Sequence, residues 1–171
     1  LLKRYPDMTK EELYAAVMCG EVRVAGGIVK NSREMVDPES EITLERPRFV
    51  SRGGEKLFAA LSGWNIDVRG KVILDAGSSS GGFTDALLKN GAAAVHAVDV
   101  GYNQIDYRLR TDSRVILHER TNIMAVEELL PAPHGAVADL SFRSLAGAAS
   151  RILSLTTEKW CVALGKPQFE M

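Results

Sequence analysis

The chain has 171 residues, enough for one medium domain or two small ones. Its hydrophobic fraction of 46% predicts a real core, and its net charge of −1 excludes a global positive field that would draw it to nucleic acid. No apolar run approaches the ~18–20 residues of a membrane span, and no secretory signal is visible. Cys19 and Cys161 lie far apart without metal-ligand spacing, so we expect buried thiols, no structural metal and a reducing, cytoplasmic location.

Residues 1–45 are predicted to form a separate small α+β unit. Thr9 and Glu12 have the spacing of a capping box, which predicts a helix from there to about Cys19. Three short strands should follow, the first two of them as a hairpin, at residues 22–24, 28–30 and 41–44. Because the chain begins at Leu1 and not at Met, we expect it to be cut at both ends.

Residues 46–52 are predicted to be a basic linker. Pro47 breaks local structure there, and three arginines make this the most basic window of the chain, a plausible track for phosphates. A helix over residues 53–61 should follow, with Lys56 off its apolar stripe. A cation near a helix N-terminus is electrostatically unfavourable, which indicates a role for Lys56 other than packing.

The rest of the chain, residues 53–171, alternates predicted strands with helices. The strands lie near 71–75, 94–98, 114–117, 135–139 and 159–164, and the helices near 82–90, 104–110, 124–130 and 144–153. This rhythm predicts an α/β fold with a parallel, doubly wound sheet. Ligands of such sheets bind at the carboxyl ends of the strands, where we expect Asp75, Asp99, Asp139 and Lys166.

A glycine-rich turn between the first strand and its helix is the predicted ligand loop. Gly77, Gly81 and Gly82 allow a tight turn and close approach to a ligand, and the next helix points its N-terminal N–H groups there. A phosphate loop is unlikely, because no Gly-Lys-Ser/Thr follows, and the spacing also differs from that of a dinucleotide site. The alternative interpretation is a purely structural turn.

The neighbours of this turn favour S-adenosylmethionine. Asp99 ends the second strand, where a carboxylate can accept hydrogen bonds from a ribose diol. Asp75 would repel a pyrophosphate but suits the positive sulfonium and amino groups of S-adenosylmethionine. Asn122 lies where an adenine-binding loop would run. Ser141 or Ser144 is expected to cap the following helix.

Six motifs together resemble the haemolysin A/TlyA family, which joins an S4 RNA-binding module to an FtsJ-like methyltransferase domain. They are Ser51-Arg-Gly-Gly-x-Lys-Leu57, Asp75-x-Gly-x-Ser-x-Gly-Gly-Phe-Thr-Asp85, Ala97-Val-Asp-Val-Gly-Tyr102, Glu119-Arg-Thr-Asn122, Asp139-Leu-Ser-Phe142 and Lys166-Pro-Gln-Phe-Glu170. The resemblance implies a Rossmann-like methyltransferase sheet, with five of its seven strands in this chain. It also implies 2′-O-methylation of ribose in ribosomal RNA, at cytidine, with S-adenosylmethionine as cofactor.

The resemblance also implies site residues. FtsJ-like enzymes use a Lys-Asp-Lys-Glu set, which Lys56, Asp139 and Lys166 match; the glutamate is expected beyond residue 171, and Gly165 replaces the usual larger apolar residue. The predicted cofactor-binding residues are Asp75, Gly77, Ser78, Gly81, Gly82, Phe83, Asp99, Val100 and Asn122. The front unit resembles an S4 module whose first helix is largely missing. The candidate RNA-binding residues are Lys3, Arg4, Lys10, Arg23, Lys30, Arg33, Arg46, Arg48 and Arg52.

The residue types suit methyl transfer to a hydroxyl. A 2′-hydroxyl must lose its proton as it attacks, and a lysine can take that proton only when a neighbouring lysine and desolvation favour its neutral form. We therefore expect Lys166 to be the base, with Lys56 and Asp139 completing the site. Three other functions stay open: a non-catalytic ribosome-binding protein, a haemolysin, which would need a membrane-active segment, and a small-molecule methyltransferase.

Overall fold

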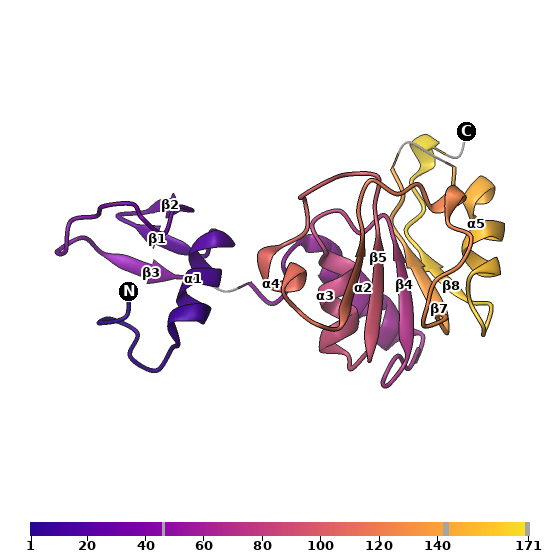
Figure 1. The fold of residues 1–171 in the computed structure, drawn as a ribbon, viewed down its shortest axis with the longest axis horizontal. Coiled ribbons are helices and arrows are strands. Elements are labelled where there is room, and N and C mark those ends of the chain that lie inside the picture. Colours follow the sequence, from indigo (N-terminus) through magenta and orange to yellow (C-terminus); the bar gives the residue numbers. More distant parts are fainter. Residues whose placement is uncertain (46, 142–143, 170–171) are drawn as a thin grey trace. The chain divides into compact units, whose positions relative to one another are not determined.

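The computed structural model describes residues 1–45, 47–141 and 144–169 and divides the chain into two compact units. The first unit is Leu1–Arg48 and the second is Phe49–Met171. Figure 1 follows the chain through both units. The division falls within the predicted linker, and each unit has its own core.

The front unit is one helix with a small antiparallel sheet. Helix α1, Lys10–Met18, begins with the predicted capping box, in which the Thr9 hydroxyl and the Glu12 carboxylate each accept a backbone N–H of the other residue. The sheet has the order β2-β1-β3, and its strands are β1 (Val22–Val24), β2 (Gly27–Val29) and β3 (Ile42–Leu44). Both the helix and the hairpin are confirmed. The core of this unit consists of buried Ala16, Val17, Val22 and Val29.

The second unit is built on a parallel five-stranded sheet with the order β6-β5-β4-β7-β8 (Figure 1). Its strands are β4 (Val72–Ala76), β5 (Ala94–Val98), β6 (Val115–His118), β7 (Gly135–Ala138) and β8 (Cys161–Ala163). The predicted α/β class is confirmed. Because the order reverses direction at β4, the carboxyl ends of β4, β5 and β7 surround the point where such sheets bind ligands.

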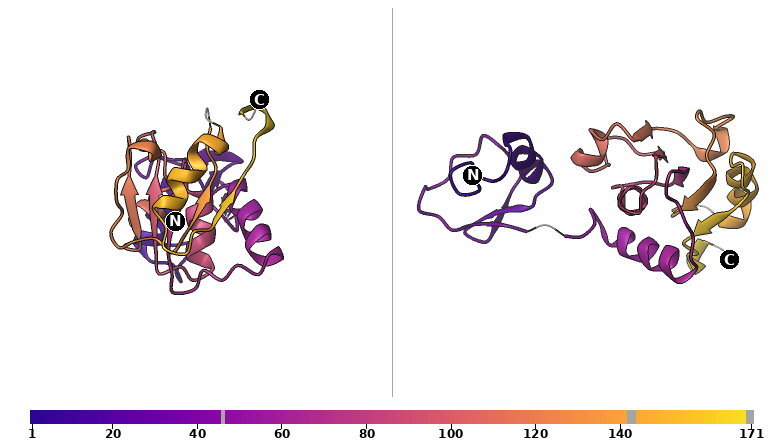
Figure 2. Two further views of the ribbon diagram at one scale, coloured as in Figure 1. Left: turned by 90° about the vertical axis from the view of Figure 1, so that its right-hand side faces the viewer. Right: turned by 90° about the horizontal axis from the view of Figure 1, so that it is seen from below.

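Helices cover both faces of this sheet (Figure 2). Helices α2 (Arg52–Gly63) and α3 (Gly82–Lys89) pack on one face, and α5 (Leu145–Ser154) packs on the other. Successive residues of β4 show why: Ile73 joins the core under α2 and α3, while Leu74 joins the core under α5. A sheet buried on both faces accounts for the continuous apolar runs in the strands.

The predicted helix over residues 124–130 is wrong. Only a single 3₁₀ turn, Ile123–Ala125, forms there, and the segment then continues without regular structure. Pro131 disfavours helical backbone at the residue before it. The Val126 carbonyl instead accepts a hydrogen bond from Arg151 of α5, while the Val126 and Leu129 side chains are buried. The predicted helix at 104–110 is shorter, α4 (Tyr107–Arg110).

A buried pair of histidines joins β5 to β6. His96 is fully buried, with Nδ1 3.0 Å from His118 Nε2 and Nε2 2.9 Å from the Pro131 carbonyl oxygen. Since a carbonyl only accepts, His96 Nε2 carries the hydrogen and Nδ1 accepts from His118. Burial lowers the pKa of both imidazoles, and for His118 the neighbouring His96 adds to this effect. The pair is therefore neutral near pH 7.

Neither cysteine forms a disulfide, and both are half-buried and not fully buried as expected. Within residues 1–45, 47–141 and 144–169, no helix has the length and apolar character needed to cross a membrane. The same residues contain no cluster of His, Cys, Asp or Glu that could hold a metal ion.

Candidate functional site

The turn after β4 depends on two glycines with left-handed backbone. Gly77 has φ +85°, and a Cβ atom there would lie 2.7 Å from the Asp139 carbonyl oxygen. Gly81 has φ +93°, and a Cβ atom there would overlap the Leu109 side chain. Side chains at either position would strain the backbone and displace a neighbour. The turn thus lies directly against the segment that follows β7.

A second set of glycines brings α2 against α3. A Cβ atom on Gly82 would overlap the Ser51 hydroxyl, and one on Gly54 would lie 3.0 Å from the Gly82 carbonyl oxygen. The N-terminal ends of the two helices therefore touch. Helix α2 begins at Arg52, one residue before the predicted start, so Arg52 and Lys56 lie four residues apart on one face.

The ends of β7 and β8 carry an ion pair. The Lys166 Nζ atom lies 2.6 Å from Asp139 Oδ1, and the same ammonium donates to the Ser141 hydroxyl at 2.9 Å. Ser141 is therefore a partner of the lysine, and Ser144 takes the N-cap position of α5. Two of the three predicted catalytic residues thus lie in direct contact.

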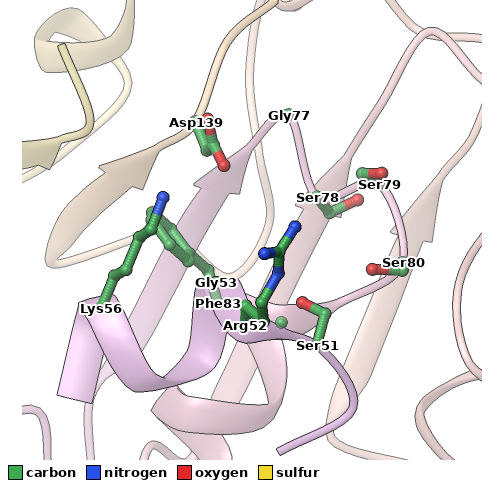
Figure 3. A pocket seen from close by; sticks show the side chains of 11 residues that line it. Ser51, Arg52, Gly53, Lys56, Gly77, Ser78, Ser79, Ser80, Phe83 and Asp139 are labelled. Atoms are coloured by element: carbon green, nitrogen blue, oxygen red, sulfur yellow. The ribbon is translucent and has the colours of Figure 1, made fainter. Parts of the chain in front are cut away.

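A cavity of about 400 Å³ opens between α2 and the glycine-rich turn. Figure 3 shows Lys56 and Arg52 rising from α2 toward the strand tips, with Asp139 across from Lys56. This first cavity is lined by Ser51, Arg52, Gly53, Lys56, Gly77, Ser78, Ser79, Ser80, Gly82, Phe83 and Asp139. It therefore contains Lys56 and Asp139, carries two positive side chains on one wall, and does not include Lys166 in its lining.

A second cavity, of about 480 Å³, lies beyond the ends of β5 and β6 and shares Gly77, Ser79 and Asp139 with the first. Its other lining residues are Val98, Asp99, Val100, Gly101, Gln104, Thr121, Asn122, Ile123, Leu140 and Ser141. The two carboxylate oxygens of Asp99 accept the backbone N–H groups of Ser79, at 2.8 Å, and of Gly101, at 2.7 Å. Asp99 thus fixes the loops on both sides of the cavity.

The predicted cofactor residues divide into three groups. Gly77 lines both cavities, Ser78, Gly82 and Phe83 line the first, and Asp99, Val100 and Asn122 line the second. Gly81 and Asp75 line neither cavity. Gly81 lies under Ile105 and Leu109, where its role is to shape the turn.

Asp75 is a fully buried carboxylate at the end of β4. Its Oδ2 atom accepts a 2.7 Å hydrogen bond from the Thr84 hydroxyl, and its Oδ1 atom has no hydrogen-bond partner among the described residues. Burial raises the pKa of Asp75 to about 7; the Thr84 hydrogen bonds oppose this shift, and the carboxylates of Asp139 and Asp99 add to it. Asp75 therefore differs from the ionised cavity-facing carboxylate that the sequence suggested.

The predicted RNA-binding residues are scattered over both units. In the front unit, Arg23 forms an ion pair with Glu45 at 2.8 Å, and Arg4 donates to the Pro38 carbonyl at 2.7 Å. Besides Arg4, the exposed members of the set in this unit are Lys3, Lys10, Lys30, Arg33 and Arg48. Arg46 lies outside the described residues. Arg52 belongs to the first cavity and not to a linker.

Sequence reasoning missed the serines. Ser51, Ser79 and Ser80 line the first cavity, and Ser141 holds Lys166. One signal was available: the run of serines inside the glycine-rich turn supplies more hydroxyl groups than a turn needs. The position of Ser51 against Gly82 had no signal, because the two residues are far apart in the chain.

Comparisons with known proteins agree with this geometry. Residues 49–171 match the model of the FtsJ-like methyltransferase family. The 16S/23S rRNA (cytidine-2′-O)-methyltransferase TlyA of Mycobacterium tuberculosis is 40% identical over 186 residues, which cover 100% of this chain and 66% of that protein. Hemolysin A of Brachyspira hyodysenteriae is 38% identical over 159 residues, which cover 90% of this chain and 66% of that protein.

A solved structure of a hemolysin-named protein from Streptococcus thermophilus is 38% identical, covers 95% of this chain and 62% of that chain, and has a TM-score of 0.70. The chain spans slightly less than two thirds of the length of the curated relatives above. These matches confirm the resemblance to haemolysin A and TlyA that the motifs indicated. Since the family match covers all of the second unit, the chain belongs to the FtsJ-like methyltransferase family.

Proposed function

We propose that this chain methylates the 2′-hydroxyl of ribose in ribosomal RNA, at cytidine, with S-adenosylmethionine as methyl donor. The observation that supports the proposal is that Lys56 and Asp139 line one cavity, and that Asp139, which both cavities share, is paired with Lys166 at 2.6 Å. Donor and acceptor can each occupy one cavity and meet at that wall. The activity named for the M. tuberculosis relative supports this substrate, and a ribosomal substrate supports a location in the cytoplasm.

The second cavity fits the adenosyl part of the donor. Gly77 lets its wall lie close against the Asp139 carbonyl, where any side chain would clash. Asp99 keeps acceptor capacity beyond its two backbone N–H partners, which suits a ribose diol. Val100 and Ile123 offer apolar surface for a base, and the Asn122 amide can contact its edge. When bound, S-adenosylmethionine supplies a methyl group on a positively charged sulfur.

The lysine at the β8 tip is positioned to take the hydroxyl proton. A neutral lysine amine has two hydrogens and one lone pair. In this structure Lys166 Nζ donates to the Ser141 hydroxyl at 2.9 Å and forms an ion pair with Asp139 Oδ1 at 2.6 Å, and these contacts hold the amine in place. Lys56 lines the first cavity together with Asp139 and can hold the acceptor oxygen there. Holding the hydroxyl and the methyl group in the reacting geometry would supply much of the rate enhancement.

The front unit is proposed to bind RNA as an S4-like module. Overall charge cannot account for RNA binding by this unit, since the net charge of the whole chain is −1. Contacts must therefore come from local cations such as Lys3 and Lys10, which are exposed. Arg52 would act with them from the first cavity.

The test is transfer of labelled methyl from S-adenosylmethionine to isolated ribosomal subunits, with Lys166→Ala beside the unchanged chain. We expect label in rRNA from the unchanged chain only, at a 2′-O-methylcytidine after digestion. Lys159→Ala is the matched control: its ammonium binds the Leu153 and Ser154 carbonyls at the end of α5, outside both cavities. Near-normal methylation by Lys166→Ala would rule out Lys166 as the base. No label from either protein, with S-adenosylmethionine binding intact, would favour a protein that binds the ribosome without catalysis.

A further inference from the structure

Two loops form the rim of the second cavity, one after β5 and one after β6. The lining residues that they supply are Val100, Gly101 and Gln104 after β5, and Thr121, Asn122 and Ile123 after β6. Backbone hydrogen bonds join the loops near their start: the Thr121 N–H donates to the Asp99 carbonyl and the Arg120 N–H to the Gly101 carbonyl, each at 2.9 Å. Among the described residues, no backbone hydrogen bond joins the two loops beyond Gly101. Residues 102–104 therefore depend on a side chain for support.

The Glu119 carboxylate supplies that support. Its Oε1 atom accepts the backbone N–H of Asn103 at 2.7 Å. Asn103 precedes Gln104, whose amide lies over Gly101 in the cavity wall. The same carboxylate receives both terminal nitrogens of Arg110, Nη2 at Oε1 and Nη1 at Oε2. A two-pronged contact between an arginine and a carboxylate fixes orientation more strictly than a single contact does.

Helix α4 connects this carboxylate to the glycine-rich turn. At the start of α4, the Asp106 N–H donates to the Ser80 carbonyl at 3.1 Å. The Leu109 side chain lies directly over Gly81, and Arg110 is the next residue. Helix α4 is thus fixed to the turn after β4 on one side and to Glu119 on the other. The segments that follow β4, β5 and β6 are joined in this way around the second cavity.

A neighbouring ion pair shows what is particular about this one. Exposed ion pairs usually contribute little to stability. Arg114 and Asp112 form such a pair at 2.7 Å, but they lie two residues apart in one loop and join nothing else. The side chains of Arg110 and Glu119 are 29% and 19% exposed, and they join two segments to a third. Neither residue lines a cavity, so any effect of the pair on a ligand must pass through the loops.

We propose that the Arg110–Glu119 pair is a positioning device for the methyl donor, which holds the loop after β5, and Gln104 with it, in place before the donor binds. This inference rests on the proposed function, because it concerns the cavity assigned to the donor. A loop that is ordered in advance lowers the entropy cost of binding. The pair should therefore strengthen donor binding and leave the methyl-transfer step unchanged.

The experiment compares donor affinity, by calorimetric titration with S-adenosylmethionine, with the kinetics of methyl transfer to ribosomal subunits. In Glu119→Ala we expect the Kd and the KM of the donor to rise about tenfold, because the loop must be ordered on binding. The kcat at saturating donor and the KM of the subunits should stay within about twofold. Asp112→Ala is the matched control, since it breaks only the local pair with Arg114, and its donor Kd should stay within about twofold.

Two further variants separate positioning from general stability. Glu119→Gln keeps an acceptor for the Asn103 N–H but loses the charge that Arg110 pairs with, so the donor Kd should rise less than in Glu119→Ala. The double variant of Arg110→Ala and Glu119→Ala should bind the donor no more weakly than Glu119→Ala alone, because both changes break one unit. In the ligand-free protein, amide hydrogen exchange of residues 100–106 should be faster in Glu119→Ala and nearly unchanged in Glu119→Gln.

The outcomes separate the two proposals. Unchanged donor affinity in a Glu119→Ala variant that folds, as thermal unfolding checks, would overturn the positioning role. So would a loss confined to kcat, additive effects of the two alanine changes, or an equal loss in Asp112→Ala. If Glu119→Ala does not fold, donor affinity in Glu119→Gln and Arg110→Ala decides the matter in the same way. Donor binding by the unchanged chain without label in rRNA would overturn the methyltransferase and leave the pair to be decided by affinity. Absence of donor binding by the unchanged chain would overturn both.

Discussion

The two cavities at the sheet edge share a wall but differ in charge. The first has Arg52 and Lys56 on one side, both supplied by α2, and a row of serines on the other. The second has Asp99 and apolar Val100 and Ile123, all from segments that follow the strands. A cationic cavity suits a polyanionic acceptor, and a cavity with a carboxylate suits a cationic donor. The difference indicates that charge alone can direct each substrate to its own side of Asp139.

The largest effect should come from a change confined to the first cavity. Lys56→Ala is expected to lower the methylation rate by ~10²–10⁴-fold, because it removes a cation beside the reacting oxygen. Donor affinity should stay within about twofold by calorimetry, since Lys56 does not line the second cavity. A large loss of donor binding would mean that the two cavities do not divide the substrates.

A change in the shared wall should harm both cavities. Gly77→Ala places a Cβ atom 2.7 Å from the Asp139 carbonyl in a backbone of φ +85°, and we expect a loss of about 1–3 kcal/mol in unfolding free energy. Donor affinity should fall at least tenfold. Gly147→Ala is the control: this helical glycine has open space, and the change should stabilise by about 0.4–1 kcal/mol. If Gly77→Ala and Gly147→Ala changed the free energy of unfolding in urea equally, the close approach of Gly77 to the Asp139 carbonyl would be contradicted.

Arg52 tests whether the first cavity accepts phosphate. Arg52→Ala should weaken binding of ribosomal RNA severalfold and lower the slope of log affinity against log salt by about 1, while donor affinity stays unchanged. Arg69→Ala is the matched control, because this exposed arginine pairs with Asp67 away from the cavity. An unchanged salt slope in Arg52→Ala would remove Arg52 from the acceptor site.

The smallest expected effect is on stability and comes from the histidine pair, which lines neither cavity. The folded-state pKa of His96 and of His118 is lowered below 6.5. The unfolded chain therefore takes up protons at a higher pH than the folded chain does, and the free energy of unfolding should fall as the pH drops below about 6.5. Asp75 acts oppositely, since its raised pKa costs stability as pH rises through about 7. Urea unfolding should therefore be measured in the Asp75→Asn background. Constant stability from about pH 7.5 to 5.5 would contradict a neutral histidine pair.

Most of the fold could be predicted from sequence because its strands carry their own signals. Each of β4, β5 and β7 is a short apolar run that ends in a carboxylate, which is the pattern of a strand buried on both faces with its tip at a ligand site. The helix prediction at residues 124–130 was wrong because the structure there depends on a contact distant in sequence and not on a local signal. There the apolar residues at helical spacing are held by a tertiary hydrogen bond from Arg151, which no local pattern reveals.

The site was predictable in residue identity but less so in geometry. Lys56, Asp139 and Lys166 were singled out from their positions at helix start and strand tips, and the structure brings them to one place. The burial of Asp75 could not be read from the sequence, because a strand-tip carboxylate can face either outward or into the core. The same holds for Arg52, whose role depends on where α2 begins.

The contact between Gly54 and Gly82 should transmit the effect of ligand binding from one helix of the second unit to another. Since no side chain separates the ends of α2 and α3, the helix that carries Lys56 cannot shift without moving the turn that faces the donor. A ligand held only by that turn should therefore slow amide hydrogen exchange in α2 as well as in α3. Lys56 would then be ordered by a molecule that it does not touch.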